Sequence, residues 1–239
     1  MKNEEWIRSA ETLFGVKLSE EQQGQFRVYE ALLIDWNSRI NLTAVRDPEG
    51  IRIKHFLDSL SCVPVLGDLN GKSLIDIGTG AGFPGIPLRI FYPELRLTLV
   101  DSVGKKTDFC QLAADTLHLK GVKVLKDRSE ELGANKAYRE KFDAATARAV
   151  AGLPVLCEYL LPLVKVGGCI LAMKGESAPE EVKAAENAIH KLGGADAELT
   201  EVKLPDVDGK RWLVKIPKLS PTPAGYPRRT GLPLKKPIL

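Results

Sequence analysis

The sequence has few of the features that would assign it to a membrane or to the secretory pathway. Its 239 residues contain no apolar run of the roughly 18 to 20 residues that a membrane-spanning helix needs. The first residues, MKNEEWIRSAETLFGV, are acidic and amphipathic, without the basic start and apolar block of a secretory signal. We therefore expect a cytoplasmic protein that makes no contact with a membrane.

Cysteine is scarce, with four residues (Cys62, Cys110, Cys157 and Cys169) and no Cys-x-x-Cys pair. The last three lie among apolar neighbours, which favours buried, reduced thiols over a disulfide framework or a metal site. We expect no bound metal.

Net charge is also small, at +3, and by itself indicates no nucleic-acid partner. The last twenty residues, SPTPAGYPRRTGLPLKKPIL, nevertheless contain four basic residues and no acidic one, so the excess positive charge lies in this tail. Such a segment either binds phosphates or is a solvated tail, and we expect it to bind RNA. The candidate residues are Arg228, Arg229, Lys235 and Lys236.

Residues 1–70 have helical patterns and predict an N-terminal helical extension. Ser19 and Gln22 have the spacing of a capping box, and Asp47 followed by Pro48 is typical of a further helix start. One apolar helix face is expected from Phe26, Tyr29, Leu33, Trp36 and Ile40.

From Ser73 onwards, short β-rich runs alternate with helical ones. This alternation predicts an α/β fold with a doubly wound, mostly parallel, seven-stranded sheet, in which a turn at Asp208-Gly209 makes the last two strands a hairpin. We expect a Rossmann-like core over residues 71–218 and a basic, proline-rich tail over residues 219–239, extended along the core.

The segment DIGTGAGFPGIPL, residues 76–88, follows the first predicted strand, where a doubly wound sheet usually holds its ligand. The pattern is Asp-x-Gly-x-Gly-x-Gly, with Phe83 where the dinucleotide fingerprint has its third glycine. Asp76 suits a ligand with a positive group, and S-adenosylmethionine carries an ammonium and a sulfonium. We expect Phe83 to project beside this cofactor and three glycines to admit it against bare backbone. These are Gly78, Gly80 and Gly82.

Two further polar turns support a nucleoside cofactor. Asp101 ends the second predicted strand, at the position from which a carboxylate accepts hydrogen bonds from ribose hydroxyls. The turn DRSEE, residues 127–131, follows the third strand, where an adenine edge would lie. A glycine-rich turn without a ligand would not explain all three features at one edge of the sheet.

A protein that binds S-adenosylmethionine typically transfers its methyl group. The motifs that this sequence lacks indicate which kind of substrate atom would receive it. FDAATARAVAGLP stands where enzymes that methylate exocyclic amino groups typically have Asn/Asp-Pro-Pro-aromatic. None of the cysteines has the Pro-Cys or Thr-Cys setting common in pyrimidine carbon-5 methylation. A ring nitrogen such as N7 of guanine has a free lone pair and needs only to be oriented, which these absences favour.

Arg148 ends the fourth predicted strand, where a substrate base would meet the methyl group, and it is the one catalytic candidate. Its alternative is a structural ion pair with a neighbouring acid, and Lys174 has the same two interpretations. His55 lies on an apolar helix face and is more typical of a packing histidine. If the tail does not bind RNA, Asn41 and Arg46 are the next candidates.

Six segments resemble the glucose-inhibited division protein B family: NLTAVRDPEGIRIKHFLDSL, IDIGTGAGFPGIPL, LVDSVGKKTDF, RSEEL, ARAVAGL and YPRRTGLPLKKPI. The resemblance runs from about Asn41 to the C-terminus. It implies a class I S-adenosylmethionine-dependent methyltransferase that makes 7-methylguanosine in small-subunit (16S) ribosomal RNA. By motif, the family's cofactor positions fall on Gly78, Phe83, Ser129, Glu130 and Arg148.

Three functions remain open from the sequence. The first is a monomeric ribosomal-RNA guanine methyltransferase, acting on free RNA or on the small subunit. The second is a small-molecule methyltransferase with the same cofactor site. The third is a non-enzymatic nucleotide-binding scaffold in cell division.

Overall fold

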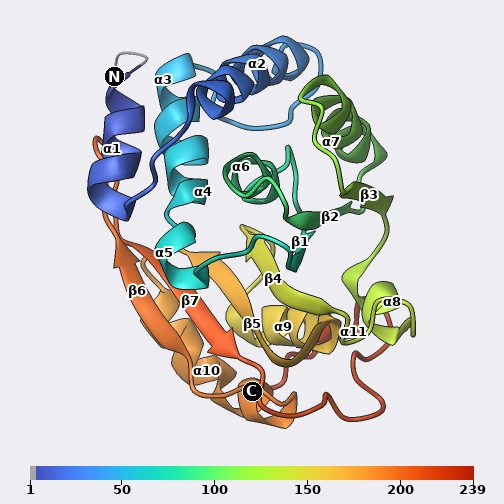
Figure 1. The fold of residues 1–239 in the computed structure, drawn as a ribbon. Helices are drawn as coiled ribbons and strands as arrows, with labels where there is room; N and C mark the ends of the chain where they lie inside the picture. Colours follow the sequence, from blue (N-terminus) through green and yellow to red (C-terminus); the bar gives the residue numbers. More distant parts are fainter. Residues whose placement is uncertain (1–3) are drawn as a thin grey trace.

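The computed structural model describes residues 4–239 and has a seven-stranded sheet at its centre (Figure 1). The strand order is β3-β2-β1-β4-β5-β7-β6, with β7 antiparallel to its two neighbours and the other pairs parallel. The strands are β1 Ser73–Ile77, β2 Arg96–Asp101, β3 Val122–Lys126, β4 Phe142–Arg148, β5 Val164–Lys174, β6 Glu198–Val202 and β7 Arg211–Pro217. This confirms the predicted doubly wound sheet and its terminal hairpin.

Helices fill the N-terminal part of the chain and the connections between strands. Residues 1–3 of the predicted N-terminal extension lie outside the described residues. The α-helices are α1 Glu5–Phe14, α2 Glu20–Asn37, α3 Pro48–Ile51, α4 Asp58–Leu60, α5 Val63–Leu66, α6 Gly85–Phe91, α7 Gly104–Thr116, α8 Ser129–Ala134, α9 Leu153–Leu160, α10 Ala178–Lys191 and α11 Leu232–Lys235. A π-helix, η1 Arg52–Leu57, joins α3 to α4, and a 3₁₀ helix, η2 Leu161–Leu163, follows α9.

The predicted helix starts are confirmed. The Ser19 hydroxyl accepts from the Gln22 N–H and the Gln22 side chain accepts from the Ser19 N–H, so a capping box opens α2. Asp47 caps α3, whose first residue is Pro48. The apolar face predicted to extend to Ile40 is too long, because α2 ends at Asn37.

The Asn37 side chain explains that end. Its Oδ1 accepts hydrogen bonds from the backbone N–H groups of Leu42 (2.9 Å) and Thr43 (3.0 Å), which turns the chain back on the helix.

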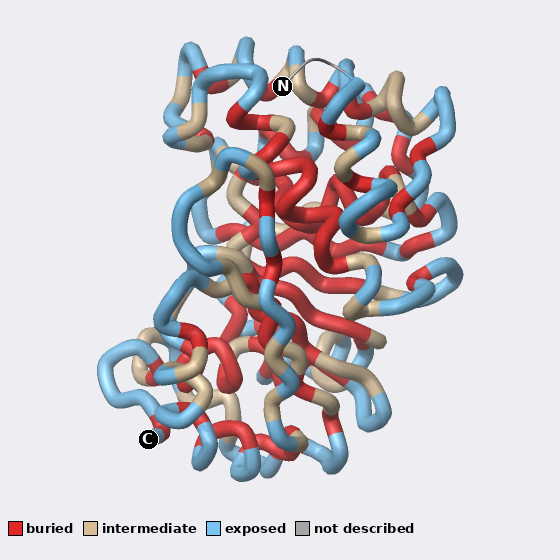
Figure 2. Tube along the Cα trace, turned by 90° about the vertical axis from the view of Figure 1, so that its left-hand side faces the viewer, coloured by how far each residue is buried: buried red, intermediate tan, exposed pale blue. Residues whose placement is uncertain are grey.

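Two apolar layers cover the sheet, because successive side chains of a strand point to opposite faces. Leu74 of β1 packs with α2, α6 and α7, whereas Ile75 and Ile77 pack with α9 and α10. Figure 2 shows the buried residues as a continuous zone through the middle of the molecule, along the strands. No helix among residues 4–239 is both long and apolar enough to cross a membrane.

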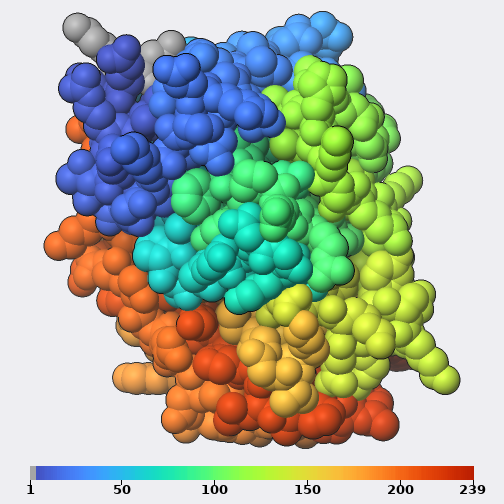
Figure 3. All heavy atoms as spheres, viewed as in Figure 1, coloured from blue at the N-terminus to red at the C-terminus, as the bar shows by residue number. Residues whose placement is uncertain are grey.

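The C-terminal segment, residues 219–239, lies on the side of the molecule away from the N-terminal helices (Figure 3). Arg139 donates to the carbonyls of Thr222 and Tyr226, and Glu140 accepts from the Thr222 N–H at 2.7 Å. The segment is less extended than predicted, because Leu232–Lys235 form α11 and Pro233 is buried.

Candidate functional site

The glycine loop, residues 78–84, joins β1 to α6 at the carboxyl edge of the parallel strands. Gly78, Gly80 and Gly82 have φ angles of +66°, +61° and +95°, a region that side chains rarely adopt. A Cβ on Gly82 would lie 2.5 Å from Ile86 Cδ1, whereas one on Gly80 would meet nothing within 4 Å. Packing within the chain therefore explains Gly82, and Gly80 borders open space.

Asp76, which the sequence predicts to meet the positive group of the cofactor, makes its hydrogen bonds within the chain. It occupies the side of β1 that carries Leu74, beneath α6, and it is fully buried. Its carboxylate accepts from the hydroxyls of Thr79 (2.7 Å) and Thr146 (3.2 Å) and from the Gly85 N–H (3.0 Å). Burial raises the pKa of Asp76 to about 6. These hydrogen bonds hold the glycine loop and the start of α6 in position.

Asp101 reaches the glycine loop from the end of β2. One carboxylate oxygen accepts from the Gly80 N–H at 3.0 Å and the other from the Val103 N–H at 2.9 Å. A carboxylate has about four lone-pair sites, so these two bonds leave acceptor capacity on each oxygen.

A small cavity of about 90 Å³ lies beside this loop, where β1, β2 and β3 end. Gly78, Asp101, Ser129 and Glu130 line it, as predicted for a common site. Val150 also lines it, and a Cβ on Gly78 would lie 2.5 Å from Val150 Cγ2. The Val150 side chain therefore covers Gly78.

The side chains of Ser129 and Glu130 already have protein partners. The Ser129 hydroxyl donates to the Tyr159 carbonyl at 2.6 Å, and Glu130 accepts from the Gly231 N–H at 2.9 Å. The C-terminal segment thus contacts a residue that lines the small cavity.

Phe83, which is predicted to project beside the cofactor, packs against α2 and the π-helix and is 3% exposed. The His55 ring stacks on it with centroids 4.6 Å apart, and the guanidinium of Arg148 lies 5.0 Å from its centre. Burial, and then the charge of Arg148, lower the pKa of His55 to about 3. The interpretation of His55 as a packing residue fits this neutral, buried ring.

Arg148, at the end of β4, forms an ion pair with a neighbouring acid, which is the structural alternative to a catalytic role. Its Nη1 lies 2.9 Å from Asp58 Oδ2 and 3.1 Å from the Lys54 carbonyl. Arg211, from the start of β7, approaches the other oxygen of Asp58 at 3.3 Å. The Asp58 side chain is 4% exposed, so one buried carboxylate is shared by two arginines.

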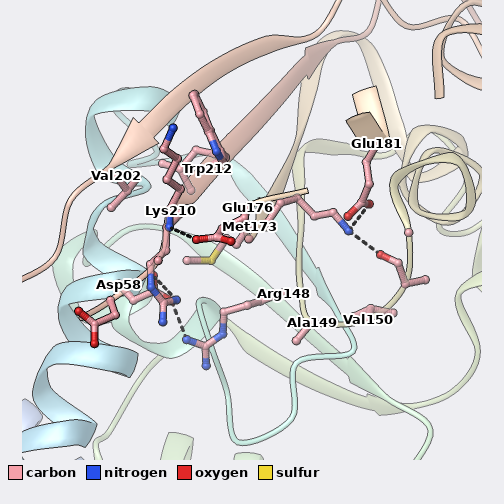
Figure 4. Close-up of a pocket in the computed structure, with 18 residues that line it drawn as sticks. Asp58, Arg148, Ala149, Val150, Met173, Glu176, Glu181, Val202, Lys210 and Trp212 are labelled. Atoms are coloured by element: carbon pink, nitrogen blue, oxygen red, sulfur yellow. Dashed lines mark hydrogen bonds and ion pairs between the residues drawn. The ribbon is translucent and has the colours of Figure 1, made fainter. Parts of the chain in front are cut away.

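A larger cavity of about 680 Å³ lies between the ends of β4 and β5 and the start of β7 (Figure 4). Asp58, Arg148 and Arg211 line it, and Val150 lines both cavities. Lys174 also lines it but is paired with Glu181 at 2.6 Å, which matches its structural interpretation.

The RNA-binding candidates differ in the exposure of their side chains and in whether these side chains are paired. Arg229, Lys235 and Lys236 are exposed, as are Asn41 and Arg46, whose side chains bond to each other at 3.3 Å. Arg228 is not free, because its guanidinium and backbone N–H bind the buried Glu158 carboxylate. A phosphate contact of Arg228 would therefore have to compete with this ion pair.

The four cysteines are free thiols, and Cys62, Cys110 and Cys157 are buried. Burial raises the pKa of Cys157 to about 12, so this thiol stays protonated at neutral pH. Within residues 4–239 no group of histidine, cysteine and acidic residues is arranged to hold a metal ion.

Asp58, Val150 and Arg211 are the residues of this region that sequence reasoning missed. Asp58 had a signal, since it is an acidic residue within the apolar helix segment HFLDSL. Arg211 had none, because it meets Asp58 across 153 positions of the chain.

Comparisons with known proteins agree with this geometry. The model of the GidB family, described as rRNA small subunit methyltransferase G, matches residues 22–209. A "Ribosomal RNA small subunit methyltransferase G" of Acetivibrio thermocellus is 49% identical over 225 residues, covering 94% of this chain and 92% of that protein. Another of that name, from Roseiflexus castenholzii, is 48% identical over 236 residues, covering 99% and 100%.

Solved structures with more distant sequences share the fold. An S-adenosylmethionine-dependent O-methyltransferase of Thermotoga maritima has a TM-score of 0.55 at 15% identity, covering 80% of this chain and 72% of that one. The 16S rRNA (adenine(1408)-N(1))-methyltransferase of Catenulisporales acidiphilia has a TM-score of 0.53 at 16% identity, covering 65% and 88%. The fold is therefore that of class I methyltransferases, and the chain belongs to the GidB family, that of rRNA small subunit methyltransferase G.

Proposed function

We propose that the protein transfers a methyl group from S-adenosylmethionine to N7 of a guanine in small-subunit ribosomal RNA. The observation that carries this proposal is the pair of cavities that meet at Val150, at the carboxyl edge of a class I methyltransferase sheet. One cavity borders the glycine loop and the other borders two arginines, so two ligands would approach each other at this point. The family of the chain supplies the substrate class.

The residues beside the glycine loop fit a nucleoside cofactor. Asp101 has lone pairs left for ribose hydroxyls, and Gly80 offers open space next to it. Ser129 and Glu130 border the same cavity and would hold the adenine side. Small-molecule sites typically have about 300 to 1,000 Å³, so Val150 must move aside to enlarge the cavity of about 90 Å³.

The chemistry asks little of the protein beyond orientation. Bound S-adenosylmethionine supplies a methyl group that is already activated. N7 of guanine has a lone pair and no proton to lose, so the site needs no general base. The buried, protonated thiols do not suit covalent attack on a pyrimidine. The main task of the site is therefore to hold N7 in line with the methyl group, which can contribute about 7 to 11 kcal/mol.

The RNA surface would include the exposed basic residues of the C-terminal segment, with Asn41 and Arg46 as further contacts. We propose a monomeric, cytoplasmic enzyme, since ribosomal RNA is made and modified there. Within the proposal the substrate is free RNA or the small subunit.

The test is methyl transfer by the purified protein from labelled S-adenosylmethionine to small-subunit RNA, free and as particles, from cells that lack the gene. We expect label in 7-methylguanosine after digestion to nucleosides. Label in a metabolite extract but not in RNA would favour a small-molecule methyltransferase. Cofactor binding without any turnover would favour a scaffold.

A further inference from the structure

The larger cavity has a balanced set of charges. Acidic and basic side chains are equal in number among its lining residues, and Lys174 with Glu181 forms one closed pair. A phosphate would meet as many negative as positive groups there. The cavity instead suits a ligand that is uncharged but carries both donors and acceptors, and a nucleobase has this character.

Its walls also suit the faces of a planar ring. Val150, Met173, Val202 and Leu213 are apolar lining residues, and the last three share the face of the sheet that carries Arg211. Unstacked bases are commonly bound against aromatic and apolar side chains. Figure 4 shows Met173 and Val202 on the side of the cavity nearest the start of β7.

The free hydrogen-bond donors lie at the start of β7. Arg148 is engaged by Asp58, by the Lys54 carbonyl and by the Phe83 ring. Arg211 pairs with Asp58 alone among the described charged groups, and its side chain is 34% exposed. The Nε of Arg211 is buried without a hydrogen-bond partner. A buried donor without an acceptor destabilises the protein, so a ligand that supplies an acceptor is favoured.

We infer that this cavity binds the target guanine and that Arg211 donates to its O6. Guanine presents two acceptors on this edge, O6 and N7, and arginine is their commonest partner. The reacting N7 must keep its lone pair for the methyl group, which leaves O6 for Arg211. Asp58 is a positioning residue, because it holds Arg211 and Arg148 by its two oxygens and touches no substrate itself. This inference rests on the proposed function and adds the residues that select the base.

The test compares Arg211→Met with Lys215→Met on the same strand. Lys215 is a matched control, since it lies four residues further along β7 and its side chain is 29% exposed, away from the cavity. Methylation of small-subunit RNA from cells that lack the gene is measured with each variant, together with cofactor affinity and thermal stability.

We expect Arg211→Met to lower kcat/KM for RNA by about 10- to 100-fold, the effect of losing a hydrogen bond from a charged donor. Cofactor affinity should stay unchanged, as should the salt dependence of RNA binding, because a base contact releases no phosphate counterion. Lys215→Met should stay within about twofold of the wild type.

A double-mutant cycle with Asp58→Asn tests the positioning role. Asp58→Asn should lower kcat/KM in the wild-type background but add little in the Arg211→Met background, because both changes remove one interaction. Additive losses, or an Arg211→Met variant as active as Lys215→Met, would overturn the inference. So would a lower salt slope of RNA binding in Arg211→Met, which would make Arg211 a phosphate contact. If the wild type itself does not methylate the RNA, the proposed function fails first.

Discussion

Arg228 and Glu158 form a bidentate ion pair that fastens the C-terminal segment to α9. Arg228 Nε lies 2.9 Å from Oε1 of Glu158, and its Nη2 lies 2.6 Å from Oε2. The Glu158 side chain is 1% exposed, and the Arg228 N–H donates to it as well. Three residues further on, the Gly231 N–H bonds to Glu130 at the small cavity, so the pair also helps to fix that wall.

The Arg228→Met variant should therefore be destabilised and should bind the cofactor more weakly. Removing one partner of a buried ion pair leaves an unpaired charge and typically costs about 3 to 5 kcal/mol. The loss is measured by urea unfolding, and the cofactor dissociation constant by calorimetry on the folded fraction. If the unfolding free energy and the cofactor affinity both equal those of the wild type, the ion pair stabilises neither the fold nor the small cavity.

Arg229→Met is the neighbouring case with the opposite expectation. This side chain is exposed, and substitutions of such residues usually change stability by less than about 0.5 kcal/mol. If Arg229 contacts an RNA phosphate, the salt dependence of binding should fall by about 0.7 to 0.9 log units per log unit of salt. An unchanged slope would remove Arg229 from the RNA surface and leave Lys235, Lys236, Asn41 and Arg46.

Gly80→Ala should weaken cofactor binding at least tenfold with only a modest loss of stability. The added methyl group meets no protein atom within 4 Å, so it would enter the space proposed for the cofactor, and the positive φ costs roughly 1 to 2 kcal/mol. Gly167→Ala is a matched control, because Gly167 also has a positive φ and open space but lies near the start of β5, at the opposite edge of the parallel strands from the glycine loop and Asp101. Equal cofactor affinities in the two variants would contradict the assignment of the pocket.

Asp76 predicts a pH dependence of stability with a definite sign. Its pKa is raised from 3.8 to about 6, so between these values the folded state binds more protons than the unfolded state. The contribution of Asp76 to stability is therefore greatest at low pH and falls as the pH rises from about 4 to 6, by about 3 kcal/mol. The difference in unfolding free energy between wild type and Asp76→Asn should show this fall. A difference that does not change with pH would mean that Asp76 titrates normally.

The sheet and the glycine loop could be predicted because their signals are local. Alternating strand and helix patterns determine the topology, and the capping box at Ser19 marks the start of α2 within four residues. The surroundings of the site residues, in contrast, depend on tertiary placement. The sequence does not show which face of β1 carries Asp76, or that α2 buries Phe83.

The pairing of charges that lie far apart in the chain could not be predicted from the sequence either. Arg228 looked like a free cation in a basic tail, but it meets Glu158 across 70 positions of the chain. Asp58 and Arg211 are brought together only when β7 pairs with β5 beside the π-helix.

The most direct test of the central claim is nucleoside mass spectrometry of small-subunit ribosomal RNA from cells with and without the gene. We expect 7-methylguanosine to decrease in the RNA of cells without it and to return with the wild-type protein, but not with Gly80→Ala. An unchanged content of 7-methylguanosine, with the protein absent, would contradict the proposed function.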